Sequence, residues 1–368
     1  MKWIRLFQMG LVAGLVLAFS ACKREPIIVS GSDNRQIEVN SLVQDRKKHN
    51  QVILLVAYGS AWEEAYNAYE LTIKAYKDRF PDHDVFLAFS SDICINIARA
   101  GANTSPRIFY NPQQYLCAFA QDGVRYKEIV VQSLQVIPSK EYDRVFGILK
   151  DFANHVDGDI DEQYLSEVCL RLGAPLLTDP EKDVSQVAKE LDRLYQELIG
   201  DDLIVFMAHG VPEEYDTYQA NVRFTELEAA LQKLNPHYFV GTLDVPGNYK
   251  TDVYRRMDKA GYNKGNRKVF LHPLLAVYGT HAHDYLFYDE SDGTRYNFAD
   301  LMAEAGDGDA IDYYWQEFFD AIGSGVACDG TSIIRKGLLD LQGIQQIWID
   351  HTKEAMRNDP LDFGSSGL

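Results

Sequence analysis

The hydrophobic positions of this chain fall into short continuous runs, and longer amphipathic stretches separate them. Three runs come early: QVILLVAYG at 51–59, DVFLAF at 84–89 and EIVVQSLQVIP at 128–138. Continuous aliphatic runs of this length are typical of strands buried on both faces of a parallel sheet. Between the first two runs, apolar and aromatic residues recur at helical spacing from Ala65 to Tyr76. The alternation predicts an α/β fold with a parallel sheet covered by helices.

The second half of the chain repeats this pattern. Its runs are DLIVFMAHG at 202–210, HYFVGTLD at 237–244 and KVFLHPLLAVYG at 268–279, with helices expected at 224–234 and near 250–260. Aligning the halves pairs LLVAYG with VFMAHG, VFLAFS with YFVGTLD, and VVQSLQVIP with FLHPLLAVYG, which indicates an internal duplication of about 150 residues. The pattern predicts two similar Rossmann-like or flavodoxin-like lobes, with a cleft between them at the carboxyl ends of the strands.

The domain organisation follows from these elements. We expect a signal peptide at 1–22, a polar tether at 23–49 with folded structure from Gln51, an N-terminal lobe with a linking helix at 50–195, a C-terminal lobe at 196–356 and a tail at 357–368. The linking helix is predicted within DPEKDVSQVAKELDRLYQELIG, at about 180–200.

The first 22 residues, MKWIRLFQMGLVAGLVLAFSAC, have the features of an export signal. Lys2 and Arg5 precede an apolar run that is too short for a comfortable membrane span, and Ser20-Ala21 supply the small residues of a cleavage site. Small residues followed at once by cysteine resemble a bacterial lipoprotein signal. We therefore expect lipidation at Cys22 and a protein exported to the periplasm or cell envelope, held to the membrane by this anchor. An ordinary secretory signal is the alternative.

The composition excludes some classes of function. A formal net charge of −18 argues against a nucleic-acid-binding protein, since such proteins need a basic face. The chain contains no G-x-x-x-x-G-K-[ST], no G-x-S-x-G and no H-E-x-x-H, which removes the main support for a nucleotide-binding, serine hydrolase or zincin reading. Cys94, Cys117, Cys169 and Cys328 form no C-x-x-C motif, so a cysteine metal site is not indicated, and their pairing stays open.

Candidate metal ligands stand at the ends of three runs in the second lobe. His209, Asp244 and His281 each follow a different predicted strand, so they should converge on one edge of one sheet. In the first lobe Tyr58 stands opposite His209 and Glu141 opposite His281, which places the coordinating chemistry in the second lobe. Two imidazoles and a carboxylate suit Co²⁺, Ni²⁺, Fe²⁺ or Zn²⁺ better than Ca²⁺ or Mg²⁺.

Several motifs carry a family resemblance. They are VFMAHG, GTLDVPG and YGTHAHDY in the second lobe, IVVQSLQVIPSKEY and RLGAPLLTD before it, and GLLDLQGIQQIWIDH near the end. In order and spacing they resemble the anaerobic, early-insertion sirohydrochlorin cobaltochelatases of cobalamin biosynthesis, which are single-chain class II chelatases independent of ATP. The match runs from about residue 51 to the end of the chain.

The resemblance implies roles for individual residues. It implies that His209 binds metal and accepts pyrrole protons, that His281 is the second metal histidine, and that Asp244 stands where the family usually has glutamate. As substrate-contacting candidates it adds Tyr58, Ser60, Gln132 and His283. The last of these stays open between a partner of the metal ligands and an exposed loop residue, whereas His272 is predicted to be structural. Ser60 is also predicted to cap the following helix, with Glu63 completing a capping box.

The implied function is the insertion of a divalent metal into a tetrapyrrole such as sirohydrochlorin, without a nucleotide. Co²⁺ is the expected metal, with Fe²⁺ or Ni²⁺ as alternatives. Export leaves two further readings open: a haem- or tetrapyrrole-binding or scavenging lipoprotein that keeps the chelatase fold, and a metal-binding lipoprotein. Assembly into a homo-oligomer also stays open.

Overall fold

The computed structural model describes residues 34–101, 105–154, 160–262, 267–286, 315, 318–319, 326–327 and 333–363. The predicted signal peptide with Cys22, the start of the predicted tether and the last tail residues lie outside the described residues. Among the helices of the described ranges, none is long and apolar enough to cross a membrane.

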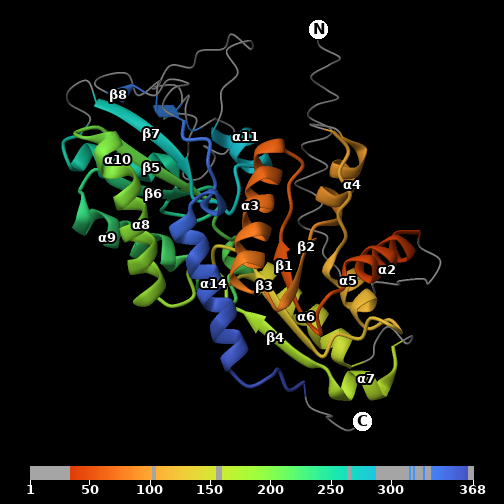
Figure 1. Cartoon of the computed structure of the whole chain (residues 1–368). Helices are drawn as coiled ribbons and strands as arrows, with labels where there is room; N and C mark the ends of the chain where they lie inside the picture. The colour runs from red at the N-terminus through yellow and green to blue at the C-terminus, as the bar shows by residue number, and fades with distance from the viewer. Residues whose placement is uncertain are drawn as a thin grey trace.

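Two parallel sheets of four strands form the framework (Figure 1). The first contains β1 (Gln51–Ala57), β2 (His83–Phe89), β3 (Glu128–Ser133) and β4 (Cys169–Gly173), and the second contains β5 (Leu203–Ala208), β6 (Tyr238–Thr242), β7 (Arg267–Pro273) and β8 (Val326–Ala327). Their orders, β2-β1-β3-β4 and β6-β5-β7-β8, are the same arrangement used twice. The predicted α/β fold and its two similar lobes are confirmed. The sequence reading missed β4 and β8, and it made the strands at 128 and 268 too long.

Helices cover both faces of each sheet. They are α2 (Asn34–Arg46), α3 (Glu63–Arg79), α4 (Asp92–Ala100), α5 (Pro112–Phe119), α6 (Lys140–Ala153), α7 (Glu162–Glu167), α8 (Lys182–Ile199), α9 (Val222–Leu234), α10 (Lys250–Lys259), α11 (Thr280–Leu286) and α14 (Gln342–Arg357), with 3₁₀ turns η1 (Glu213–Tyr215) and η5 (Leu338–Asp340). The largest apolar core contains side chains from β1–β3 and from β5 and β6, so it is continuous between the lobes. Two smaller cores each belong to one lobe.

The folded part of the chain begins earlier than predicted, within the segment expected to be a polar tether. Residues 34–46 form α2, and Gln36, Val39 and Val43 are buried on one face of that helix. The two valines, four residues apart, pack in the outer core of the first lobe. The side-chain amide of Gln36 donates to the carbonyl of Gln114 in α5 at 3.0 Å. The prediction that folded structure starts at Gln51 is therefore wrong, because two well-spaced apolar residues suffice to dock a mostly polar helix.

The two lobes exchange one helix each. Helix α8 follows the first sheet, yet its Tyr195 packs against Phe206 of β5 and His272 of β7, with ring centroids 6.3 and 5.1 Å apart. Helix α14 follows the second sheet and packs on β3 and β4 of the first, and Figure 1 shows it crossing between the lobes beside α8. The predicted boundary near 195 thus separates each of these helices from the sheet that it covers.

The exchange has the same backbone pattern on both sides. The N–H groups of Leu176 and Leu177 donate to the carbonyls of Gln135 and Val136, and those of Leu338 and Leu339 donate to the carbonyls of Leu275 and Ala276. Each pair holds the segment that leads directly into the exchanged helix. The internal duplication therefore includes the segment that leads each exchanged helix to the other lobe.

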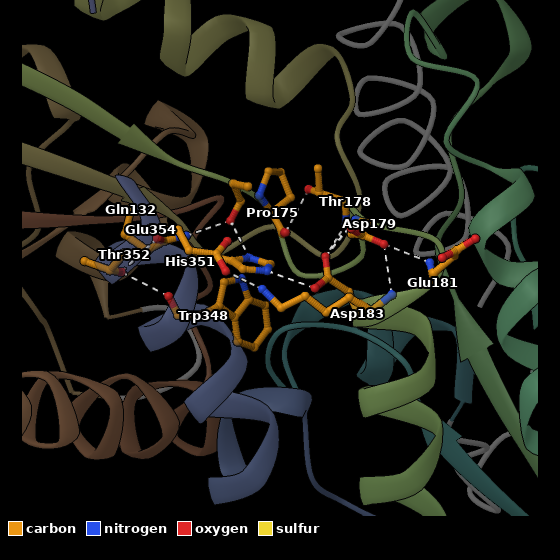
Figure 2. A network of polar contacts seen from close by, with 12 residues as sticks. Gln132, Pro175, Thr178, Asp179, Glu181, Asp183, Trp348, His351, Thr352 and Glu354 are labelled. Carbon is orange, nitrogen blue, oxygen red and sulfur yellow. Dashed lines mark hydrogen bonds and ion pairs between the residues drawn. The ribbon is translucent and has the colours of Figure 1, made fainter. Parts of the chain in front are cut away.

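Buried polar contacts join the exchanged helices where they meet (Figure 2). Asp183 of α8 accepts hydrogen bonds from the backbone N–H groups of Thr178 and Asp179, at 3.1 and 2.7 Å. Its other oxygen lies 3.1 Å from Nε2 of His351 in α14. Nδ1 of His351 in turn lies 3.2 Å from the carbonyl oxygen of Ala174. The Asp183 carboxylate thus connects the segment just before α8, α8 itself and α14.

Candidate active site

A turn at a glycine follows the first strand of each lobe and sets the orientation of the residue before that glycine. Gly59 after Tyr58 has φ +115°, and Gly210 after His209 has φ +79°, a region that side chains with a Cβ rarely adopt. A Cβ on Gly210 would also lie 2.5 Å from Cγ2 of Val245. The sharp turn leaves His209 at the carboxyl end of β5, where its imidazole Nδ1 lies 3.0 Å from the carbonyl oxygen of Gly210.

Asp244 is fixed beside His209 by the backbone. Its N–H donates to the carbonyl of His209 at 3.0 Å, and the N–H of Leu243 donates to the carbonyl of Ala208 at 3.1 Å. These bonds continue the pairing of β5 and β6 past the strand ends. They bring the Asp244 carboxylate to 3.1 Å from Nδ1 of His209.

His281 reaches the same place from a helix. The sequence reading placed it directly after a strand, but β7 ends at Pro273 and His281 lies in the first turn of α11. Pro273 has no N–H to donate to a sheet, so the strand stops there. The imidazole of His281 lies edge-on to that of His209, with centroids 4.6 Å apart and planes at 88°. The structure therefore brings together all three predicted metal ligands.

The two imidazoles have different electrostatic surroundings. Burial lowers the pKa of His281 to about 3, and the neighbouring His209 adds to this. Burial also acts to lower the pKa of His209, but the hydrogen bond and charge of Asp244 outweigh it and raise the pKa above the ordinary value. His281 thus offers a neutral nitrogen, while His209 can hold a proton against Asp244.

The described residues contain no group of three or more His, Cys, Asp and Glu side chains already arranged to hold a metal. At this edge Nδ1 of His209 and one carboxylate oxygen of Asp244 face each other at 3.1 Å. A cation that bound His209 through Nδ1 would have to displace Asp244 and the imidazole proton.

The first lobe holds an equivalent trio, of which the alignment of the two halves already pairs Tyr58 with His209 and Glu141 with His281. The N–H groups of Ser90 and Ser91 donate to the carbonyls of Ala57 and Tyr58, which is the same bonding that places Asp244 against His209. By this correspondence Tyr58 matches His209 and Ser91 matches Asp244. Glu141 lies in the first turn of α6, as His281 lies in that of α11. The internal repeat was also the signal that could have identified Ser91.

Burial shifts both titratable members of this first-lobe trio. It raises the pKa of Tyr58 to about 12, with the hydrogen bond to Ser91 opposing the shift. Burial also raises the pKa of Glu141, opposed by the charges of Arg144 and Lys140. The hydroxyl of Ser90 lies 3.5 Å from the Glu141 carboxylate. A carboxyl group with a raised pKa is suited to exchange protons nearer neutrality than an exposed glutamate.

Contacts between the lobes show that the two strand-end edges face each other. On one side, Thr217 donates to the carboxylate of Asp143 in α6 at 2.9 Å, and the Tyr218 hydroxyl donates to the same group. On the other side, Trp62 before α3 stacks on His283 of α11, with centroids 3.6 Å apart and planes at 11°. The two trios therefore belong to one interlobe site.

The remaining substrate-contacting candidates have different outcomes. Gln132 is fully buried at the end of β3: its amide nitrogen donates to the carbonyls of Ser133 and Ala174, and its oxygen accepts from Thr352 of α14. Because its amide groups are already paired and none is exposed, the prediction that Gln132 contacts substrate is wrong. It fastens α14 to the first sheet instead (Figure 2).

Ser60 does not cap α3, because that helix starts at Glu63 after Trp62 and has no side-chain cap. Its buried hydroxyl instead faces the second lobe, where a Cβ on Gly279 would lie 2.6 Å from it. His283 is not an exposed loop residue, since its side chain is only 15% exposed.

His272 is fully buried between Tyr195 and Phe206, as its predicted structural role requires. In the described part of the chain, no disulfide joins Cys94, Cys117 or Cys169.

Comparisons with known proteins agree with this architecture. A sequence model of the cobalt chelatase (CbiK) family matches residues 51–357. The sirohydrochlorin cobaltochelatase CbiKC of Nitratidesulfovibrio vulgaris is 25% identical over 304 residues, which cover 83% of this chain and 90% of that protein. The sirohydrochlorin cobaltochelatase of Salmonella typhimurium is 24% identical over 261 residues, covering 69% and 87%. Among solved structures, SirB from Bacillus subtilis with Fe³⁺ superposes with a TM-score of 0.50 and 13% identity, covering 85% of this chain and 99% of that one.

Proposed function

Because the chain belongs to the cobalt chelatase (CbiK) family, we propose that it inserts Co²⁺ into sirohydrochlorin or a closely related tetrapyrrole, with the interlobe site as its active site. The single observation that carries this assignment is the convergence of His209, Asp244 and His281 at one strand-end edge. The metal is a substrate here. The nitrogen and oxygen donors of the trio suit a borderline divalent cation, so Fe²⁺ and Ni²⁺ are the alternatives to test, and no step requires a nucleotide.

The trio would receive the metal before the macrocycle does. His281 supplies a neutral nitrogen lone pair, and Asp244 supplies negative charge. Entry of the cation releases the proton that His209 shares with Asp244. Protein ligands then replace part of the hydration shell, and the ion can exchange them one at a time for pyrrole nitrogens.

Insertion also requires proton acceptors. A free-base tetrapyrrole loses two N–H protons when a dication enters, so the balanced products are the metallated ring and two protons. Once the metal has left it, His209 can take one proton, and Asp244 stabilises the resulting imidazolium. Glu141, on the facing wall beside Tyr58, is placed to take the other from the opposite face of the ring when ionised. Tyr58 lies where it could contact the macrocycle, whereas the buried hydroxyl of Ser60 and the stacked ring of His283 could reach it only if the contacts between the lobes open.

We propose further that the protein is exported and anchored through a lipid on Cys22. The support is the leader, with Lys2 and Arg5, the apolar run and Ser20-Ala21 directly before the cysteine. Incorporation of radiolabelled palmitate into the full-length chain, and its loss in Cys22→Ser, would support the anchor. Equal labelling of both chains would contradict it.

The insertion activity is tested with the chain lacking residues 1–22. The protein is mixed anaerobically with sirohydrochlorin and Co²⁺, and then with Fe²⁺ or Ni²⁺, while the absorbance change of metal insertion is followed. His209→Ala should lose the acceleration. His237→Ala is the matched control, because this histidine precedes β6 at the opposite end of the sheet. No acceleration by the wild type, with the macrocycle still bound tightly, would instead indicate a tetrapyrrole carrier.

A further inference from the structure

A second group of side chains closes one side of the interlobe site next to the metal trio. Trp62 and His283 stack face to face across the lobes, and Tyr278 packs edge-on against His283 with centroids 4.8 Å apart. Glu64, in the first turn of α3, lies 3.7 Å from Nε2 of His283. Ser60 touches the backbone at Gly279 in the same seam. The seam thus joins the loop after β1 to the start of α11.

Helix α11 connects this seam to the metal trio. His281 and His283 are two residues apart, so their side chains leave the helix about 200° apart around its axis. One imidazole faces His209 in its own lobe, and the other faces Trp62 in the opposite lobe. The helix has only seven residues, so a movement of His283 moves His281 with it. The position of the metal histidine therefore depends on a contact with the first lobe.

The seam has the features of a contact that opens and closes. Ser60 Oγ, Trp62 Nε1 and Tyr278 OH are buried there with no hydrogen-bond partner among the described residues, and the buried Nε2 of His283 faces the Glu64 carboxylate 3.7 Å away, beyond hydrogen-bond distance. Unpaired buried polar atoms weaken the closed arrangement relative to an open one in which water reaches them. Aromatic stacking favours the closed arrangement. The stacking and the unpaired polar atoms therefore act on the closed arrangement in opposite directions.

We propose that Trp62 and His283 form an interlobe clasp that holds α11 and so places His281 beside His209 and Asp244 for metal transfer. Closing the clasp completes the trio, and opening it admits the macrocycle and separates His281 from its partners. Trp62 and His283 are positioning residues in this scheme, because they act through His281 and do not themselves bind the metal. The inference rests on the proposed function only in taking the trio as the metal site.

The test compares Co²⁺ binding by the macrocycle-free protein, measured by anaerobic calorimetry, in five chains. Trp62→Ala and His283→Ala remove the stack. His283→Phe keeps an aromatic ring but has no ligating nitrogen. Tyr218→Phe is the matched control, since it weakens the interlobe contact to Asp143 on the other side of the cleft without touching α11. Near-ultraviolet circular dichroism verifies that each chain is folded, and His283→Ala still tests the clasp if Trp62→Ala does not fold.

We expect the two alanine variants to bind Co²⁺ roughly 2- to 12-fold more weakly, the range that loss of one aromatic pair allows, with His283→Phe and Tyr218→Phe close to wild type. In insertion assays, KM for Co²⁺ should rise in the alanine variants. Equal weakening in His283→Phe and His283→Ala would show that His283 is itself a ligand and would overturn the clasp. Unchanged Co²⁺ affinity in both alanine variants would overturn it as well. A wild type that binds Co²⁺ but inserts none contradicts the proposed function alone.

Discussion

The carboxylate of Asp183 lies 3.1 Å from Nε2 of His351, which ties the helix that covers the second sheet to the helix that covers the first. Both ring nitrogens of His351 face oxygen acceptors, because Nδ1 lies 3.2 Å from the carbonyl oxygen of Ala174. An imidazole satisfies two acceptors only when both nitrogens carry a proton. The junction of the lobes is thus best satisfied by a charged histidine, and both side chains of the pair are almost fully buried.

This pair predicts a loss of stability at high pH. Burial acts to lower the pKa of His351, but the hydrogen bond and charge of Asp183 raise it above the ordinary value. The contribution is therefore complete below the ordinary histidine pKa of about 6.5 and is lost as the pH rises through the folded value. His351→Gln should lower the free energy of unfolding by roughly 3–5 kcal/mol at acidic pH and by less at alkaline pH. Thermal unfolding across pH measures this, and an equal loss at every pH would contradict it.

His272 predicts the opposite dependence. Burial lowers its pKa to about 3, so it stays neutral in the folded protein. As the pH falls below about 6.5, the unfolded chain takes up this proton first, and folding is weakened by up to about 1.4 kcal/mol per pH unit. His272→Leu should make acid unfolding less steep while keeping the packing against Tyr195 and Phe206. Chemical denaturation at a series of acidic pH values tests this, with His49→Leu as a control at a partly exposed position before β1. A variant with the wild-type slope would refute the assignment.

Asp244 should determine how far the rate of metal insertion falls at acidic pH. It raises the pKa of His209, and His209 must lose its proton before it can bind metal or accept a pyrrole proton. In Asp244→Asn the pKa of His209 should fall, so the acid limb of the pH–rate profile moves to lower pH while the maximal rate decreases. Asp244→Glu, which keeps a carboxylate at this position, should keep the acid limb. An acid limb that does not move in Asp244→Asn would mean that another group controls it.

Replacing Glu141 should slow metal insertion without weakening Co²⁺ binding. Glutamine at this position cannot accept a proton but retains the size of the side chain, so Glu141→Gln should slow insertion by ~10²-fold or more. Its Co²⁺ affinity should match wild type, because Glu141 belongs to the first-lobe wall and not to the metal trio. Single-turnover insertion and Co²⁺ calorimetry on the same protein separate the two quantities. A parallel loss of both would place Glu141 among the metal ligands.

The sequence predicted the parts of the site that follow from parallel sheets. Carboxyl ends of neighbouring parallel strands share an edge, so runs ending in His209 and Asp244 had to meet there. The same logic located His281 correctly in space, although a helix rather than a strand carries it. Gln132 was misassigned because a polar residue at the end of a buried strand can face either the cleft or a covering helix, and only the position of α14 decides which.

The helix exchange could not be predicted from local patterns. The apolar faces of α8 and α14 show that each covers a sheet, but both sheets present aliphatic side chains of the same kind. Short-range preferences favour the sheet that is adjacent in sequence. The choice depends on long-range contacts such as Thr352 with Gln132, which have no signal in either segment alone.

The exchange of α8 and α14 also determines when, during synthesis, each sheet acquires the helix that covers it. During synthesis, the first four strands emerge long before α14, the helix that covers β3 and β4 and the last helix of the chain in the described residues. A ribosome-bound fragment that ends after α8 would expose the apolar face of one sheet and carry a helix whose own sheet has not yet been made. Either half expressed alone would lack the helix that covers its sheet, and any stop codon before residue 342 removes the helix that covers β3 and β4.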